Sequence, residues 1–421
     1  MRFAGNSILV ENNSFRSSQL REAATLGKIP EGISPNKRAL RPARRYALAH
    51  STRFLCALLE KPEMDKKLKL IYLVLLLTLN LSCVEKKSTE KETHKPELIV
   101  NSKTDTLKFT SGIRAIFQDS KGNYWVGSHN EGVCYYDGKS FEYFTTSEGL
   151  SNNQIRSIQE DQNGKIWIGT AKGVSVYDKG MFTNYSTITN DPKYDWNKTS
   201  GDLWFYAGEE DGINRFDGMN MNYLIFPKPK NEHPNKSYGV TGISKDTDGT
   251  VWIATYSALF NYNGKMTTIF DTKKLKLKDS EVLHIRSVLA DSKGRIWIGN
   301  NGIGVLLKKG DSITHFSKEQ GKLLSMNEFE ANTKTQQFAK NTGLQSVFAI
   351  EEDTEGNIWF GDRDSGAWKY NGTTLTNYTI DSELSKVMVW TIYKDNGTNL
   401  LFGMANGRVY KFNGKTFDKT F

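Results

Sequence analysis

The residue types that most often perform catalysis or hold metals are sparse in this chain of 421 residues. The six histidines show no H-x-x-x-H or other metal-ligand spacing, and no nucleophile elbow or Gly-rich phosphate loop occurs. The three cysteines, Cys56, Cys83 and Cys134, are too far apart for a C-x-x-C site. We therefore expect no catalytic residue, no metal and no cofactor.

A different set of polar residues suits binding rather than catalysis. Carboxylates, amides, one guanidinium and one phenol lie in turns that follow the second strand of a repeated unit described below, and such groups hydrogen-bond well to a polyhydroxylated ligand. The predicted ligand-binding residues are Glu209, Glu210, Asp211, Tyr256, Asn300, Asn301, Asp362, Arg363 and Asp364. For any single one of them, simple solvation of a polar turn is an equally good interpretation.

The elements that must position these turns come from a unit that repeats from Ser111 onward. Its core phrase is an apolar pair three residues apart, then Asp-x-x-Gly, then Trp between apolar residues, then Gly. The clearest copy carries Ile155, Ile158, Asp161, Gly164 and Trp167. A period of about 40 to 45 residues is typical of propeller blades. Seven copies are found, of which the third and the seventh are degenerate.

Each copy contains four short strands separated by turn residues, for example "IRAIFQD", "NYWVGS", "GVCYYDG" and "SFEYF". In the Asp-x-x-Gly turn the Asp caps the backbone and the Gly supplies a positive φ. Four-stranded sheets bury both faces only when packed radially. We therefore predict an all-β fold, a seven-bladed β-propeller of four-stranded antiparallel blades spanning 105–421. Either "DTLKF" at 105–109 or "KTFDKTF" at the C-terminus is expected to complete the outer strand of the seventh blade.

Six of the nine tryptophans occupy one position of the repeat. A buried Trp removes roughly 200 Å² from water, or about 5 kcal/mol gross, so core packing is favoured over a surface role. Trp196, Trp368 and Trp390 lie outside this register and are better candidates for a surface role, although Trp368 alternates within a third strand and fits the core as well.

Connections between copies lengthen at 187–197, 227–239, 271–282 and 317–343. All four join an outer strand to the next inner strand, so they emerge on one rim of the disc. The turns after the second strands open on the same rim, and insertions in repeat proteins usually lie on the binding face.

The repeats resemble the two-component regulator propeller family, and residues 161–178 match its blade pattern nearly throughout. The resemblance covers roughly Ser111 to Phe421. It implies a sensing module of the kind that precedes hybrid histidine kinases in Bacteroidetes-type bacteria, where glycan fragments are typical cues. Because the chain ends after the seventh copy, we expect no phosphotransfer by this chain alone. Streptogramin lyases share the architecture, but no His and Glu arrangement here could be assigned to their chemistry.

A signal-like segment lies far from the first residue. Met64 opens a basic n-region, Leu70 to Leu79 is apolar, and Ser82-Cys83 closes the segment, as in a bacterial lipoprotein signal peptide in which the cysteine is lipidated. Asn80 departs from the Leu usual at that position. We predict that 1–63 is a disordered upstream extension, 64–82 the signal peptide and 83–104 a polar tether. The alternative is a buried helix that happens to end in cysteine.

The net charge of +9 is concentrated in this leader. Residues 1–63 hold 11 Lys+Arg against 5 Asp+Glu, and 64–82 hold 3 against 1, which leaves +1 for the remainder. That balance is too weak for nucleic-acid binding. We expect an exported, lipid-anchored monomer of the cell envelope that binds a small molecule, a glycan or another envelope protein without catalysis. The alternatives are a propeller enzyme, a lyase or hydrolase, and a protein scaffold.

Overall fold

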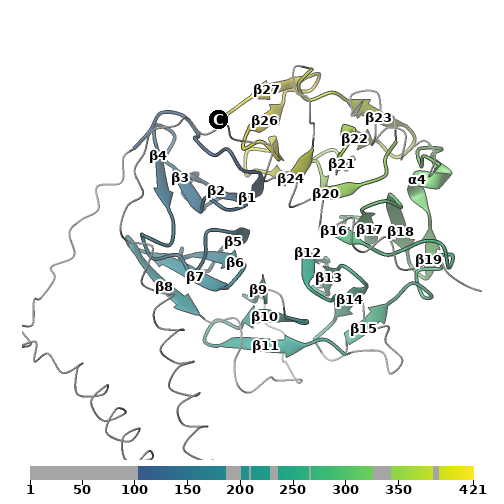
Figure 1. The fold of residues 1–421 in the computed structure, drawn as a ribbon, viewed down its shortest axis with the longest axis horizontal. Helices are drawn as coiled ribbons and strands as arrows, with labels where there is room; N and C mark the ends of the chain where they lie inside the picture. The colour runs from purple at the N-terminus through teal and green to yellow at the C-terminus, as the bar shows by residue number, and fades with distance from the viewer. Residues whose placement is uncertain are drawn as a thin grey trace, which may run out of the picture. The chain divides into compact units, whose positions relative to one another are not determined.

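The computed structural model describes residues 103–185, 201–207, 210–227, 236–264, 267–325, 343–382 and 388–421. Seven antiparallel sheets stand around a central axis, each formed by strands consecutive in sequence (Figure 1). This arrangement confirms the predicted seven-bladed β-propeller, which lies within one compact unit, Glu97–Phe421. The predicted extension, signal peptide and most of the tether, Cys83 included, lie outside the described residues.

Six blades have four strands each, with the first strand nearest the axis (Figure 1). Blade 1 contains β1 (Ile113–Gln118), β2 (Tyr124–Ser128), β3 (Val133–Tyr136) and β4 (Phe141–Phe144). Blade 2 contains β5 (Ile155–Glu160), β6 (Ile166–Thr170), β7 (Gly173–Asp178) and β8 (Met181–Tyr185). Blade 4 contains β12 (Val240–Lys245), β13 (Val251–Thr255), β14 (Leu259–Tyr262) and β15 (Thr267–Phe270).

Blade 5 contains β16 (Ile285–Ala290), β17 (Arg295–Asn300), β18 (Val305–Lys309) and β19 (Ser312–Thr314), followed by the short helix α4 (Phe316–Glu319). Blade 6 contains β20 (Val347–Glu352), β21 (Ile358–Asp362), β22 (Gly366–Tyr370) and β23 (Leu375–Tyr378). Blade 7 contains β24 (Val389–Lys394), β25 (Leu400–Met404), β26 (Val409–Phe412) and β27 (Phe417–Lys419). Blade 3 contributes three described strands, β9 (Leu203–Tyr206), β10 (Gly212–Phe216) and β11 (Met221–Ile225).

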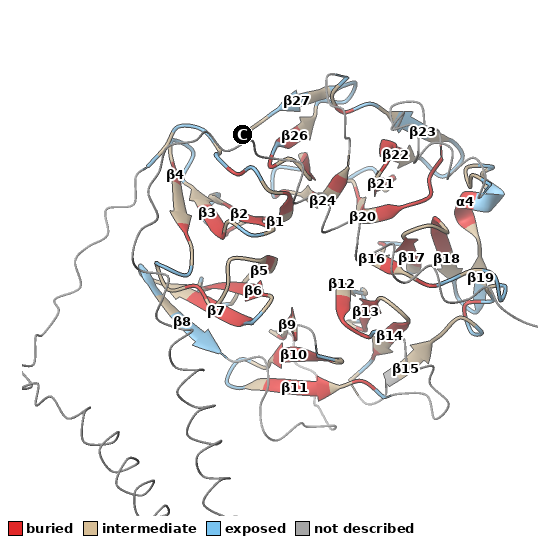
Figure 2. Cartoon of the chain, in the orientation of Figure 1, coloured by how far each residue is buried: buried red, intermediate tan, exposed pale blue. Residues whose placement is uncertain are grey.

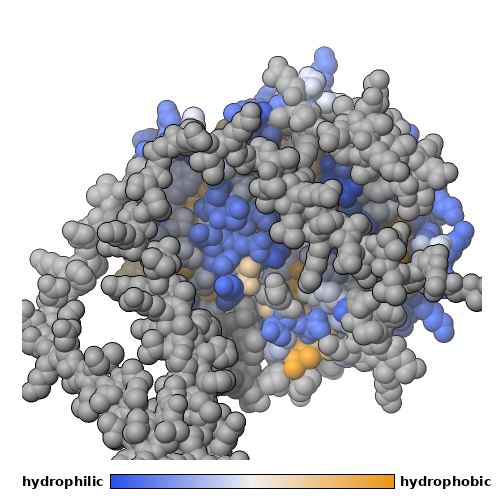
Figure 3. All heavy atoms as spheres, in the orientation of Figure 1, coloured by the Kyte–Doolittle hydropathy of each residue, from blue (hydrophilic) through white to orange (hydrophobic). Residues whose placement is uncertain are grey.

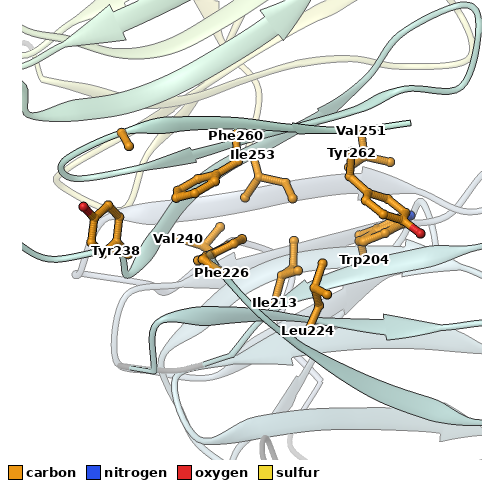
Figure 4. Packing of buried hydrophobic residues seen from close by; sticks show 11 residues of the cluster. Trp204, Ile213, Leu224, Phe226, Tyr238, Val240, Val251, Ile253, Phe260 and Tyr262 are labelled. Carbon is orange, nitrogen blue, oxygen red and sulfur yellow. The ribbon is translucent and has the colours of Figure 1, made fainter. Parts of the chain in front are cut away.

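The core lies between blades, and Figure 2 shows burial concentrated away from outer strands such as β8 and β23. Between blades 3 and 4, for example, Ile213 and Leu224 pack against Ile253 and Phe260 (Figure 4). The six tryptophans that share a repeat position are all buried. In four blades the indole Nε1 also donates to the turn aspartate, as Trp297 does to Asp291 at 2.7 Å. The structure therefore confirms that these tryptophans are packing residues.

The three remaining tryptophans differ. Trp368 is 2% exposed and donates to Ser365 Oγ, so it belongs to the core. Trp390 lines a central cavity described below. Trp196 lies outside the described residues.

The C-terminal segment, rather than 105–109, completes blade 7. β27 pairs with β26, and the N-terminal segment forms a single bridge from Thr104 to Phe141 of blade 1. "DTLKF" is therefore not a strand of blade 7; instead Phe109 is buried in the cluster between the first and last blades. A side chain at Gly403 of blade 7 would collide with Ile113 of blade 1, so this glycine allows the two blades to approach.

Candidate functional site

The innermost strands share an irregularity at one position. In blade 1, Ile113 pairs with Ser128 and Ala115 pairs with Gly127, so Arg114 is an extra residue in a β-bulge. The same shift occurs in the five other blades whose innermost strand is described. The bulged residues are Arg114, Arg156, Thr241, Arg286, Phe348 and Trp390. A bulge re-aims the side chain of its extra residue, and here all six side chains line the same cavity.

This cavity of about 310 Å³ lies among the innermost strands, on the axis of the propeller. Tyr206 and Tyr256 also line it, beside the bulged residues. Tyr206 comes from β9 and donates to the Thr241 carbonyl at 3.2 Å, and Tyr256 comes from the turn after β13. Figure 3 shows hydrophilic side chains gathered beside the axis, over β1 and β5, on the face toward the viewer.

Three of the bulged residues form a concentrated positive charge, here called the arginine trio (Arg114, Arg156 and Arg286). Burial, and then repulsion from the other two guanidinium groups, lower the pKa of Arg114 to about 10. Burial likewise lowers the pKa of Arg286. No ion pair links any of the trio to a carboxylate in the part of the chain that the structure describes.

Aromatic rings hold two of the three arginines in place. The guanidinium of Arg114 lies 4.8 Å from the centre of the Trp390 ring, and that of Arg286 lies 4.2 Å from the Phe348 ring. Arg286 also approaches Tyr256, with its Nη1 atom 3.5 Å from the phenolic oxygen. Such cation–π contacts fix the plane of a guanidinium while leaving its N–H groups free to donate.

Trp390 is itself positioned by three neighbours. A side chain at Gly112 would collide with the indole ring, so only glycine leaves room for this packing. The His129 ring meets the indole edge-on at 5.0 Å between centroids, and the indole Nε1 lies 2.8 Å from Met388 Sδ. The ring orientation is therefore determined by the fold before any ligand arrives.

Two histidines beside the cavity remain neutral at pH 7. Burial, followed by repulsion from Arg114, lowers the pKa of His129 to about 4. Burial, followed by repulsion from Arg286 and Arg363, lowers the pKa of His284 to about 4. In both shifts the arginine charge adds to the effect of burial, so neither histidine carries charge near the axis at pH 7.

The predicted binding residues divide into two groups by what their side chains contact. Tyr256 lines the cavity. Arg363 of blade 6 donates to Asn301 of blade 5 at 3.2 Å and to its neighbour Asp364 at 2.9 and 2.7 Å. Arg363, Asn301 and Asp364 therefore form one network near His284, whose ring contacts the cavity-lining Tyr256.

Other predicted binding residues serve the fold. Asp362 is 1% exposed and accepts hydrogen bonds from four backbone N–H groups, and Asn300 is fully buried. Asp211 accepts from the Tyr238 N–H at 3.1 Å, beside the exposed Glu210. Glu209 lies outside the described residues.

Sequence reasoning missed the arginine trio, although a signal was present. In the six described inner strands the position after the first apolar residue varies (Arg, Arg, Thr, Arg, Phe, Trp), while the next position is always small or hydroxylated. A variable position inside an otherwise constant motif indicates a side chain that is needed neither for core packing nor for a turn. The constant residues of the repeat form the core and the turns, and the variable residue lines the cavity.

Within the described residues, no three His, Cys, Asp or Glu side chains gather as they would to hold a metal ion. Among the same residues, no helix is both long and apolar enough to cross a membrane.

The fold and its axial cavity define a seven-bladed propeller. The two component regulator propeller model matches residues 108–130, 149–172 and 280–302, so the chain carries repeats of this type. No curated protein matches the chain.

Solved structures share the fold at low identity. The extracellular domain of the putative one component system BT4673 from B. thetaiotaomicron is 22% identical with a TM-score of 0.53, over 73% of this chain and 39% of that one. That of the putative hybrid two component system BT3049 from B. thetaiotaomicron is 18% identical with a TM-score of 0.54, over 74% and 40%. The chain thus spans about two fifths of these domains. Virginiamycin B lyase from Staphylococcus aureus is 16% identical with a TM-score of 0.53, over 74% and 97%.

Proposed function

We propose that this propeller is a non-catalytic binding module whose ligand enters the axial cavity. The observation that carries the proposal is the composition of the cavity wall. Of the described residues that line it, the ionisable ones are arginines and tyrosines, with no histidine, cysteine, aspartate or glutamate among them. General acid–base catalysis most often uses one of those absent groups, whereas binding needs only shape, rings and hydrogen-bond donors.

The same wall favours a small glycan over an apolar ligand. Trp390, Phe348 and Tyr256 offer ring faces, and the hydroxyls of Tyr206 and Thr391 lie beside them. A sugar has one apolar face to place on a ring and hydroxyl groups to hydrogen-bond around its edge. A cavity of about 310 Å³ lies at the small end of ordinary ligand sites, so one or two sugar rings fill it.

We also propose that the protein is exported and attached by lipid at Cys83. The signal-like segment from Met64 to Cys83 supports this placement, as does the likeness of the fold to extracellular domains. A sensor-like role beside the envelope follows from these two features together.

The test is a thermal-shift screen of residues 84–421 against mono- and oligosaccharides, followed by prolonged incubation with each hit. A shift without turnover supports the binding module. Turnover of a hit would favour the enzyme, and no shift across a broad panel would favour a protein scaffold. Trp390→Ala should abolish the shift, whereas Met219→Ala, at an 84% exposed side chain away from the cavity lining, should preserve it.

A further inference from the structure

Other guanidinium groups that are buried or half-buried pair with carboxylates of the chain itself. Arg215 lies 2.7 Å from Asp202, Arg295 lies 2.6 Å from Asp291, and Arg363 lies 2.7 Å from Asp364. A buried charge left without a partner is costly, which is why such pairing is usual. The three half-buried arginines of the trio depart from this pairing in one place, within the described part of the chain.

The departure is not forced by the fold. The bulge position carries Thr241, Phe348 and Trp390 in other blades, so a neutral residue is structurally acceptable there. Three guanidinium groups facing one cavity repel one another, and the lowered pKa of Arg114 expresses that repulsion together with burial. A ligand that supplied negative charge would remove the repulsion, and only then would the trio be fully paired.

The orientation of the trio suits an oxyanion. Arg114 and Arg286 lie over aromatic rings, and the Arg156 Nη2 donates to the Gln154 side-chain oxygen at 3.0 Å. A planar guanidinium held in this way presents parallel N–H donors that match the oxygens of a carboxylate, a sulfate or a phosphate. The neutral histidines nearby add no competing charge.

We propose that the arginine trio binds an oxyanion carried by the ligand, so that the module recognises acidic rather than neutral sugars. This inference rests on the proposed function and names the ligand class of the same cavity. The ring of the sugar lies against Trp390, Phe348 and Tyr256, and its acidic group lies among Arg114, Arg156 and Arg286.

The experiment is isothermal titration calorimetry of residues 84–421 with matched probes. Glucuronate is compared with glucose, oligogalacturonate with galactose oligomers, and a sulfated sugar with its unsulfated parent, while sodium sulfate and sodium phosphate test the free ions. We expect acidic sugars to bind and neutral partners to bind at least about tenfold more weakly. The acidic probe with the highest affinity identifies carboxylate or sulfate as the group bound. Stronger binding of a free ion than of any sugar would overturn the assignment to acidic sugars.

Variants separate the trio from general electrostatics. Arg114→Gln, Arg156→Gln and Arg286→Gln should each lower the affinity for the acidic probe by about tenfold or more. Arg286→Lys should recover part of the loss, because lysine keeps the positive charge but lacks the paired N–H donors of a guanidinium group. Lys121→Gln removes an exposed charge in the Asp-x-x-Gly turn of blade 1 and should leave the affinity unchanged. Thermal melts establish that each variant is folded, and a trio variant that does not fold is replaced by its Lys counterpart.

A second readout does not depend on a substitution. Binding of an oxyanion should raise the pKa of His129, measured by NMR, since the repulsion from the trio would be neutralised. If neutral sugars bind as tightly as acidic ones and the Gln variants bind both unchanged, the oxyanion assignment is wrong while the binding module stands. If no probe of either kind binds, the proposed function fails and the inference fails with it.

Discussion

The Tyr124 hydroxyl of blade 1 donates a 2.6 Å hydrogen bond to the Asp395 carboxylate of blade 7. In four other blades the equivalent aspartate accepts from the indole of its own blade, but Leu401 replaces that tryptophan here. The Tyr124 hydroxyl from the neighbouring blade therefore donates to the Asp395 oxygen that corresponds to the acceptor of the indole in those blades. The first and last blades are joined by side chains, since no strand passes between their sheets among the described residues.

Tyr124→Phe should lower the free energy of unfolding by about 1 to 2 kcal/mol, because the Asp395 carboxylate loses a donor at the junction of blades. Urea denaturation measures the change. Tyr136→Phe is the matched control, since Tyr136 packs on Phe141 and no hydroxyl hydrogen bond is found for it among the described residues. Equal effects of the two substitutions would contradict the role assigned to the Tyr124 hydroxyl.

Trp167→Ala should cost about 3 to 5 kcal/mol, because the ring is 2% exposed and packs at 4.1 Å between centroids against Phe216 of the next blade. Chemical denaturation followed by circular dichroism measures the loss. A folded variant of normal stability that had lost ligand binding would refute the packing role of this repeat position.

Thr398→Gly should stabilise the protein by about 1 kcal/mol. Thr398 has a φ of 71°, in the place where the turns of other blades carry glycine, and a β-branched residue is strained there. Gly122→Thr, at a φ of 87° in open space in blade 1, is the reciprocal substitution and should destabilise by a similar amount. A rise in melting temperature for the first and a fall for the second would establish the strain.

His129 should make folding less favourable as the pH falls from about 6.5 to about 4. The unfolded chain takes up a proton on this residue near pH 6.5, while the folded pKa of about 4 keeps it neutral. Asp362 and Glu351, whose pKa values burial raises to about 6 and about 7, act in the opposite direction, so the wild type alone is ambiguous. The melting temperature of His129→Gln should therefore decline less steeply across this window than that of the wild type, and parallel curves would exclude the effect.

Cys83→Ala, expressed from Met64, should release the protein from the membrane fraction. Acyl chains contribute about 0.8 kcal/mol per buried CH₂, and this variant has no site for them. Fractionation and immunoblotting measure the distribution, with Cys134→Ala, at a buried thiol of blade 1, as the control that keeps the anchor. Continued co-sedimentation of Cys83→Ala with membranes would disprove lipid attachment.

The blade repeat and the buried tryptophans could be predicted from sequence because both depend on local spacing. Closure of the ring could not, since 105–109 and the C-terminus have equally good strand patterns and only the pairing of the C-terminal segment with β26 distinguishes them. The cavity was missed for a related reason. Arg114, Arg156 and Arg286 are more than 40 residues apart in the sequence. A register shift in each of their strands brings them to one axis, and no residue type in the sequence marks such a shift.

The bulged residue of each described inner strand is excluded from the regular pairing of its sheet and lies outside the core clusters between blades. Selection on stability therefore acts on its neighbours and leaves this position free to vary. A propeller built in this way holds a ring of independently changeable side chains around a scaffold that need not change with them. New ligand preferences can then arise through single substitutions in one blade at a time, and each intermediate protein remains folded.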